Sequence, residues 1–132
     1  SNAEIFAGRL DVLHKQLRAE LKPAMGSPVF LFHPSFRYML KRYKLLYAGA
    51  IEEFPGSEPS PKYIAELVKR IEGMGARAVF TEPQLPEAPA KTISEAAGVP
   101  LYTLDPVGGV KGRKSYSDLM IYNAKVLKKA LR

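Results

Sequence analysis

Three side chains that could bind a metal ion each stand one or two residues beyond a short apolar run. They are His33, Glu82 and Asp105. One imidazole and two carboxylates form a nitrogen and oxygen ligand set that suits Zn²⁺ or Mn²⁺. The sequence therefore predicts a metal site, provided that the three apolar runs end at the same edge of the fold.

Each of these residues also has a purely structural interpretation. A histidine at a strand end is more often hydrogen-bonded within the fold than bound to a metal. Asp105 precedes Pro106 and could form an Asx turn. Glu82 could hold the backbone N–H groups of its own loop. From the sequence alone, metal binding and a purely structural role both stay open for these residues.

The elements that would position these side chains alternate regularly along the chain. Four short apolar runs without polar alternation are typical of strands buried on both faces. Each run is followed by a helical pattern, and a further amphipathic helix over residues 4–21 precedes the first run. The four runs are residues 29–32, 45–51, 78–80 and 99–104, and the helices that follow them are residues 36–43, 61–72, 88–97 and a final helix capped by Ser115.

This order predicts an α/β fold: a three-layer domain with a four-stranded parallel sheet flanked by helices. We expect the strand order 2-1-3-4. Ligands of open α/β sheets collect at the carboxyl ends of the strands. His33, Glu82 and Asp105 all follow strands at that edge, which makes it the predicted binding site.

Composition excludes several classes of protein. The chain has 132 residues, 46% of them hydrophobic, and no cysteine, which fits one globular domain without disulfides or thiolate zinc sites. No apolar run approaches the roughly 20 residues that span a bilayer.

Two further features lie just before and within the first predicted helix. Ser1–Ala3 resemble the remnant of a cleaved tag. His14 lies beside the apolar stripe of its helix and is predicted to be solvated.

Two other function classes remain as alternatives. The net charge of +7 would suit a nucleic-acid or anionic-surface binder, and residues 111–132 carry seven Lys and Arg against one Asp. Cations at a helix C-terminus are favoured by the helix dipole, however, and no aromatic platform accompanies them. A flavodoxin-like enzyme or interaction domain with no metal role is the other alternative, although the chain has no nucleophile elbow or phosphate loop.

Five motifs in register carry a family resemblance that covers nearly the whole chain. The chain resembles the C-terminal lobe of the periplasmic zinc- and manganese-binding proteins that serve ABC importers. The motifs are residues 32–36 (FHPSF), 56–61 (GSEPSP), 79–84 (VFTEPQ), 104–106 (LDP) and 115–120 (SYSDLM) with Asn123.

The resemblance implies a two-lobed protein with a metal ion held between the lobes. Residues 4–24 would be the end of the helix that links the lobes, and residues 25–132 the C-terminal lobe. The N-terminal lobe, with two histidine ligands, would be missing from this chain. His33 and Asp105 match the ligand positions of the C-terminal lobe, and Glu82 matches a glutamate with a supporting role.

The resemblance also implies a function without catalysis. The expected role is capture of a metal ion, zinc rather than manganese, in the periplasm or outside the cytoplasm, and its delivery to the membrane permease of an ABC importer. With two of the four ligands, this chain alone should bind zinc weakly or not at all. We also expect a homodimer through the face that would meet the missing lobe, and no nucleic-acid partner.

Overall fold

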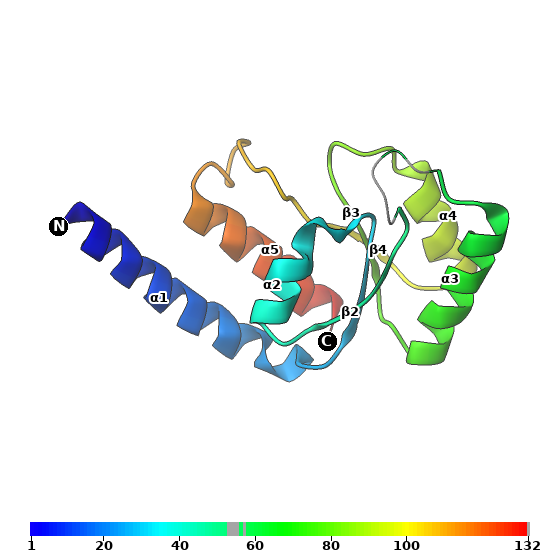
Figure 1. Ribbon diagram of the computed structural model, residues 1–132, viewed down its shortest axis with the longest axis horizontal. Coiled ribbons are helices and arrows are strands. Elements are labelled where there is room, and N and C mark those ends of the chain that lie inside the picture. The colour runs from blue at the N-terminus through cyan, green and yellow to red at the C-terminus, as the bar shows by residue number, and fades with distance from the viewer. Residues whose placement is uncertain (53–55, 57, 132) are drawn as a thin grey trace.

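The computed structural model describes residues 1–52, 56 and 58–131 and contains five α-helices and four strands within them (Figure 1). Short 3₁₀ helices at Lys22–Ala24 and Pro34–Phe36 precede β1 and α2. The elements, in chain order, are α1 (Asn2–Leu21), β1 (Pro28–Leu31), α2 (Arg37–Arg42), β2 (Leu46–Ala50), α3 (Pro61–Met74), β3 (Val79–Thr81), α4 (Ala88–Ala97), β4 (Leu101–Thr103) and α5 (Tyr116–Ala130).

The four strands form one parallel sheet in the order β2-β1-β3-β4, which confirms the predicted fold class and strand order. In the central pair, Leu31 of β1 lies opposite Phe80 of β3. In the next pair, Thr81 of β3 lies opposite Thr103 of β4. These registers fix which side chains meet beyond the strand ends.

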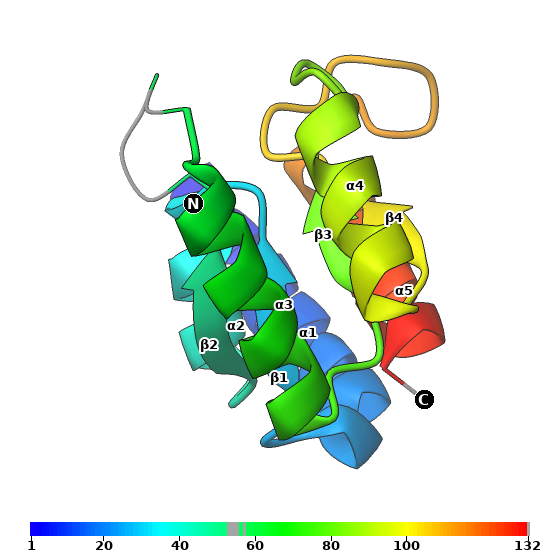
Figure 2. The ribbon, with the colours of Figure 1, turned by 90° about the vertical axis from the view of Figure 1, so that its right-hand side faces the viewer.

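Helices cover both faces of the sheet and bury a separate apolar cluster on each. One cluster joins the sheet to α1, α2 and α5, with Leu17, Leu40 and Leu127 fully buried. The other joins it to α3 and α4, with Leu67 and Ile93 fully buried. Figure 2 shows α3 and α4 in front of the strands and α1 behind them. The strands are therefore covered on both faces, as their unbroken apolar runs require.

The predicted helix ends on the α3 and α4 side are confirmed by their caps. The hydroxyl of Ser60 accepts a hydrogen bond from the Tyr63 amide at the start of α3. Gly75 and Gly98 end α3 and α4 in the left-handed conformation, at φ of 64° and 69°, which a residue without Cβ adopts readily. Ser115 caps α5 through the Asp118 amide, also as predicted.

Other elements differ from their predicted extents. Where one helix was predicted over residues 36–43, the structure has a 3₁₀ turn at Pro34–Phe36 followed by the short helix α2, and the fixed φ of Pro34 suits the first position of that turn. Strands β2 and β4 are shorter than the apolar runs that predicted them. The amides of Ile51 and Leu104, just beyond these strands, still donate to the carbonyls of Leu31 and Thr81 at 2.9 Å, so the backbone pairing continues past the strand ends.

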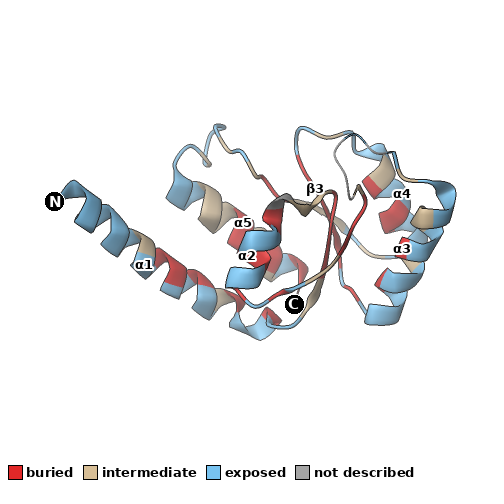
Figure 3. Ribbon diagram, viewed as in Figure 1, coloured by how far each residue is buried: buried red, intermediate tan, exposed pale blue. Residues whose placement is uncertain are grey.

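Helix α1 is buried only along its second half. Its buried residues are Leu13, His14, Leu17 and Leu21, whereas Phe6 is 57% exposed. The first half extends past the rest of the chain and is exposed (Figures 1 and 3). The predicted apolar stripe thus continues beyond the surface that this chain can cover.

Among the described residues, none of the helices combines the length and hydropathy needed to cross a membrane.

Candidate metal centre

Each of the three predicted metal ligands immediately precedes a proline. The residue before proline is restricted to extended backbone, since the proline ring clashes with a helical conformation there. His33 accordingly has φ −141° and ψ 166° and continues the direction of β1. A residue that stands between a strand and a proline therefore stays extended, and its side chain is held at the edge of the sheet.

His33 and Glu82 are brought together at the carboxyl ends of β1 and β3. The Nδ1 atom of His33 lies 2.9 Å from Oε2 of Glu82, whose side chain is only 4% exposed. The carboxylate accepts, so Nδ1 carries the proton, and the lone pair of a neutral ring lies on Nε2. A carboxylate bound to one ring nitrogen is the arrangement that orients metal-binding histidines.

The side chain of Asp105 is buried and accepts hydrogen bonds from several donors. Its Oδ1 accepts from the amides of Val107 and Gly108, at 3.0 and 2.9 Å. Its Oδ2 accepts from Nε of Arg113 at 2.8 Å. The contact with the Val107 amide, two residues along, is an Asx turn, which was the structural alternative for this residue.

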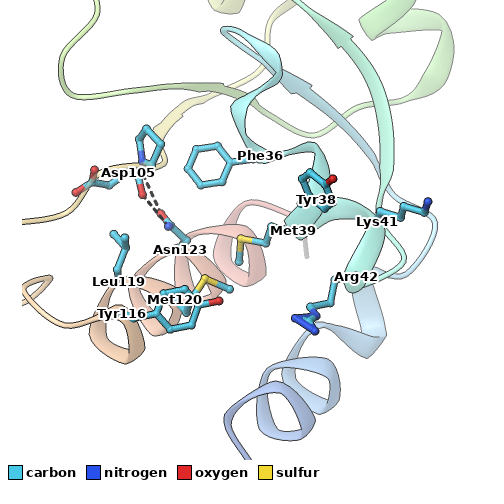
Figure 4. A pocket seen from close by; sticks show the side chains of 11 residues that line it. Phe36, Tyr38, Met39, Lys41, Arg42, Asp105, Tyr116, Leu119, Met120 and Asn123 are labelled. Carbon is cyan, nitrogen blue, oxygen red and sulfur yellow. Dashed lines mark hydrogen bonds between the residues drawn. The ribbon is translucent and has the colours of Figure 1, made fainter. Parts of the chain in front are cut away.

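The backbone of Asp105 is clamped by a second side chain. Asn123 of α5 accepts from the Asp105 amide through Oδ1 at 2.8 Å and donates to the Asp105 carbonyl through Nδ2 at 2.9 Å. Asn123 is 1% exposed, so this pair is sheltered from water. The two bonds tie the end of β4 to α5 (Figure 4).

The carboxyl group of Asp105 is ionised well into the acid range. Burial raises its pKa, but hydrogen bonds from the Gly108 and Val107 amides and the ion pair with Arg113 outweigh burial and hold the pKa below its ordinary value. Asp105 is therefore an anion whose charge is balanced by an arginine.

Within the described part of the chain, no group of three His, Asp or Glu side chains is placed to hold a metal ion. In the structure, the His33 side chain pairs with Glu82, and the Asp105 side chain pairs with Arg113. A groove of about 650 Å³ between α2 and α5 reaches Asp105, with Phe36 and Met120 among its lining residues (Figure 4). Neither His33 nor Glu82 lines this groove.

Two contacts, one at the site and one away from it, were not predicted from the sequence. Arg113 was counted only as part of a basic segment, yet it pairs with Asp105 and lies 4.2 Å over the ring of Tyr122. His14, predicted to be solvated, is 6% exposed and bonded to Tyr43, so that prediction was wrong. No local pattern indicates either contact, because both partners are distant in sequence.

Residues 1–130 match the protein family described as "Zinc-uptake complex component A periplasmic". The chain belongs to this zinc-uptake family. A curated relative is the high-affinity zinc uptake system protein ZnuA of Brucella abortus (strain 2308), 33% identical over 107 residues that cover 81% of this chain and 32% of the relative. The family resemblance drawn from the five motifs is thereby confirmed.

Solved structures of similar proteins share the fold of this zinc-uptake family member. A crystal structure of ZnuA superposes with a TM-score of 0.86 at 24% identity, over 99% of this chain and 49% of that one. A zinc-bound mutant variant of AdcAII from Streptococcus pneumoniae gives 0.83 at 27% identity, over 99% and 48%. The chain thus spans about a third of the Brucella protein and about half of these solved chains.

Proposed function

We propose that this chain takes part in capturing zinc outside the cytoplasm and delivering it to the permease of an ABC importer. One observation carries the proposal: in a chain of the zinc-uptake family, the sheet edge presents an imidazole held through Nδ1 by a buried carboxylate, His33 to Glu82. That arrangement places the proton on Nδ1 and the lone pair of the neutral ring on Nε2, and it makes Nε2 more basic. Binding and release need no covalent chemistry, so we propose no catalytic activity.

The chain would act as the C-terminal lobe of a two-lobed protein, residues 25–132, with residues 4–24 as the end of the linking helix. The exposed first half of α1 supports this division, because its apolar side chains Ile5 and Phe6 are 55% and 57% exposed. The length of the relatives leaves room for a second lobe. In isolation the same apolar face would favour a homodimer.

Zinc is the cargo of the proposed site, and His33 is its first ligand. Asp105 would be the second, after Arg113 has turned away. Arg113 and a zinc ion cannot share Oδ2 of Asp105 at low cost, since two like charges about 4 Å apart repel strongly in a partly buried site. The other two ligands would come from a second lobe, so the affinity of this chain alone should be low. Mn²⁺ remains a second candidate cargo.

Delivery of the zinc ion would require its bonds to these ligands to weaken. A ligating histidine must be neutral, so protonation of His33 favours release. Docking on the permease would shift the two lobes and separate their ligands. We propose a periplasmic or extracytoplasmic location, in agreement with the family description.

Zinc titration calorimetry tests the role of His33. The wild-type chain should bind zinc with an affinity weaker than micromolar, and His33→Ala should remove that binding. The His14→Gln variant is the matched control, because His14 is the other of the two histidines and lies away from the sheet edge. Submicromolar binding that survives His33→Ala would rule out the assignment.

A further inference from the structure

A second pocket, at the opposite edge of the sheet from His33, gathers four cationic side chains. It has a volume of about 210 Å³ and lies between the end of α1 and the end of α2. Lys22 precedes β1 and Lys44 precedes β2, whereas His33 follows β1. The pocket is lined by Arg18, Ala19, Lys22, Met25, Arg42, Tyr43 and Lys44.

Among the described residues, no acidic side chain lines the pocket or pairs with these four cations. The lining contains no Asp or Glu, and residues 21–51 of the sequence contain none either. In the part of the chain that the structure describes, no carboxylate lies within ion-pair distance of Arg18, Lys22, Arg42 or Lys44. Like charges held together without a counter-ion repel one another, so this cluster favours an added anion.

The negative dipole ends of α1 and α2 are too weak to neutralise the four cations. Each helix C-terminus carries roughly −0.5 of a charge, so the ends of α1 and α2 together offset about one of the four cations. A net charge of about +3 then remains around the pocket.

The two arginines are held in place by one buried histidine. Nη1 of Arg42 donates to Nε2 of His14 at 3.0 Å, and Nε of Arg18 reaches the His14 carbonyl at 3.4 Å. Nδ1 of His14 bonds the Tyr43 hydroxyl at 2.8 Å. Figure 4 shows the Arg42 side chain extending from α2 toward α1. Both arginines are exposed, and these hydrogen bonds restrict side-chain freedom that would otherwise be lost on binding an anion.

The backbone of the lysine in the α2–β2 turn is also constrained. Lys44 has a φ of 58°, the left-handed conformation that residues other than glycine rarely adopt. Its carbonyl accepts from the Gly26 amide at 2.8 Å, which ties this turn to the segment after α1. The turn is thereby held in the conformation that brings Lys44 into the pocket lining.

We propose that this pocket is a binding site for a phosphate group, formed by Arg18, Lys22, Arg42 and Lys44. Free phosphate carries roughly one to two negative charges near neutral pH, and the phosphodiester of a lipid headgroup carries one. The oxygens of either group accept hydrogen bonds from the guanidinium groups of Arg18 and Arg42 and from the ammonium groups of Lys22 and Lys44. The volume is below that of pockets for drug-sized ligands, as suits a small anionic group. The group belongs either to a free phosphate or to the headgroup of an anionic lipid.

The test compares two double variants that lose the same charge. In Lys22→Gln/Lys44→Asn the pocket loses two cations, and asparagine tolerates the left-handed backbone at position 44. In the control, Lys62→Gln/Lys69→Gln, the charges are removed from exposed positions of α3. Inorganic phosphate is titrated into each chain at constant ionic strength, with NMR spectra and the melting temperature as readouts.

Wild type and control should bind phosphate and melt at a higher temperature with it, and the pocket variant should bind at least about tenfold more weakly. The pKa of His14 should rise when phosphate binds, because the anion offsets the charges of Arg42 and Arg18; Asp11 and Tyr43, the other titratable groups near this ring, are unchanged in all variants. Equal affinity in the two double variants would overturn the proposal.

Co-sedimentation with lipid vesicles distinguishes the two sources. Binding to phosphatidylglycerol vesicles and not to phosphatidylcholine vesicles, lost in the pocket variant and kept in the control, identifies a lipid headgroup. Binding to inorganic phosphate without vesicle binding identifies free phosphate. The proposal fails if neither probe binds, or if anionic vesicles bind both double variants equally.

Discussion

His33 and Glu82 are cross-strand neighbours just beyond the ends of β1 and β3. Leu31 of β1 pairs with Phe80 of β3, and the same register, continued by two residues, places His33 opposite Glu82. Cross-strand neighbours lie about 5 Å apart at Cβ, which lets a glutamate reach an imidazole. The observed 2.9 Å contact between Nδ1 and Oε2 is thus a consequence of strand pairing.

Substituting Glu82 with glutamine should weaken zinc binding by roughly 10 to 100 fold, because the imidazole loses the charged acceptor that orients it and raises its basicity. Competition with a chelator of known affinity measures the change. Glu95→Gln, on the exposed face of α4, is the matched control and should bind as wild type does. Unchanged affinity in Glu82→Gln would show that Glu82 has no part in metal binding.

Removing the arginine that pairs with Asp105 should have opposite effects on zinc affinity and on stability. Arg113→Gln frees Oδ2 and removes a competing cation, so zinc should bind at least about tenfold more tightly. Without its partner the buried carboxylate should cost about 3 kcal/mol of unfolding free energy. Calorimetry and urea denaturation of the same sample measure both. Weaker zinc binding would mean that Arg113 supports the metal site and does not compete for it.

The buried His14 should make folding sensitive to pH just below neutrality. Burial, Arg42 and Arg18 lower the pKa of His14 below 6.5, and Asp11 opposes them. The folded chain therefore keeps His14 neutral while the unfolded chain takes up a proton below pH 6.5. The unfolding free energy should fall as the pH drops from 6.5 through the folded pKa, by about 1.4 kcal/mol for each unit of the shift.

Urea denaturation between pH 7.5 and 5 checks this effect against His14→Gln. The variant should lack this part of the pH dependence, although it is less stable throughout. The same slope in both proteins would assign the pH dependence to other groups.

The loop that holds Asp105 should depend on a glycine at position 108. Gly108 has a φ of 74°, and a Cβ there would lie 2.7 Å from the carbonyl oxygen of Arg113. Gly108→Ala should therefore displace the loop and destabilise the chain by about 2 kcal/mol or more. Gly109→Ala is the control, because φ is 87° there but nothing lies within 4 Å. It should cost about 1 kcal/mol, and equal melting temperatures for the two would contradict the steric account.

Much of the fold could be predicted from local signals. Ser60, Gly75 and Gly98 mark helix ends by chemistry that acts within one turn, and all three were confirmed. Buried strands were recognised by apolar runs without alternation. The first half of α1 shows the limit of such patterns: an apolar stripe indicates that a face is covered, but not by what.

For the candidate site, the sequence predicted which residues lie at the carboxyl edge of the sheet, but not which of them contact one another. The sequence alone determined that His33, Glu82 and Asp105 follow strands and precede prolines. Which of them meet was decided by register: continued by one residue, the β3–β4 pairing places Leu104, not Asp105, opposite Glu82. Asp105 is therefore one residue beyond the position in register with Glu82, and its side chain pairs with Arg113.

Asp105 is held instead by Arg113 and Asn123, partners 8 and 18 residues away. Local sequence encodes the backbone and its caps because those interactions span a few residues. Ion pairs and buried hydrogen bonds join groups that only the packed chain brings within 3 Å of each other, so the tertiary structure alone decided how the charges of this site are balanced.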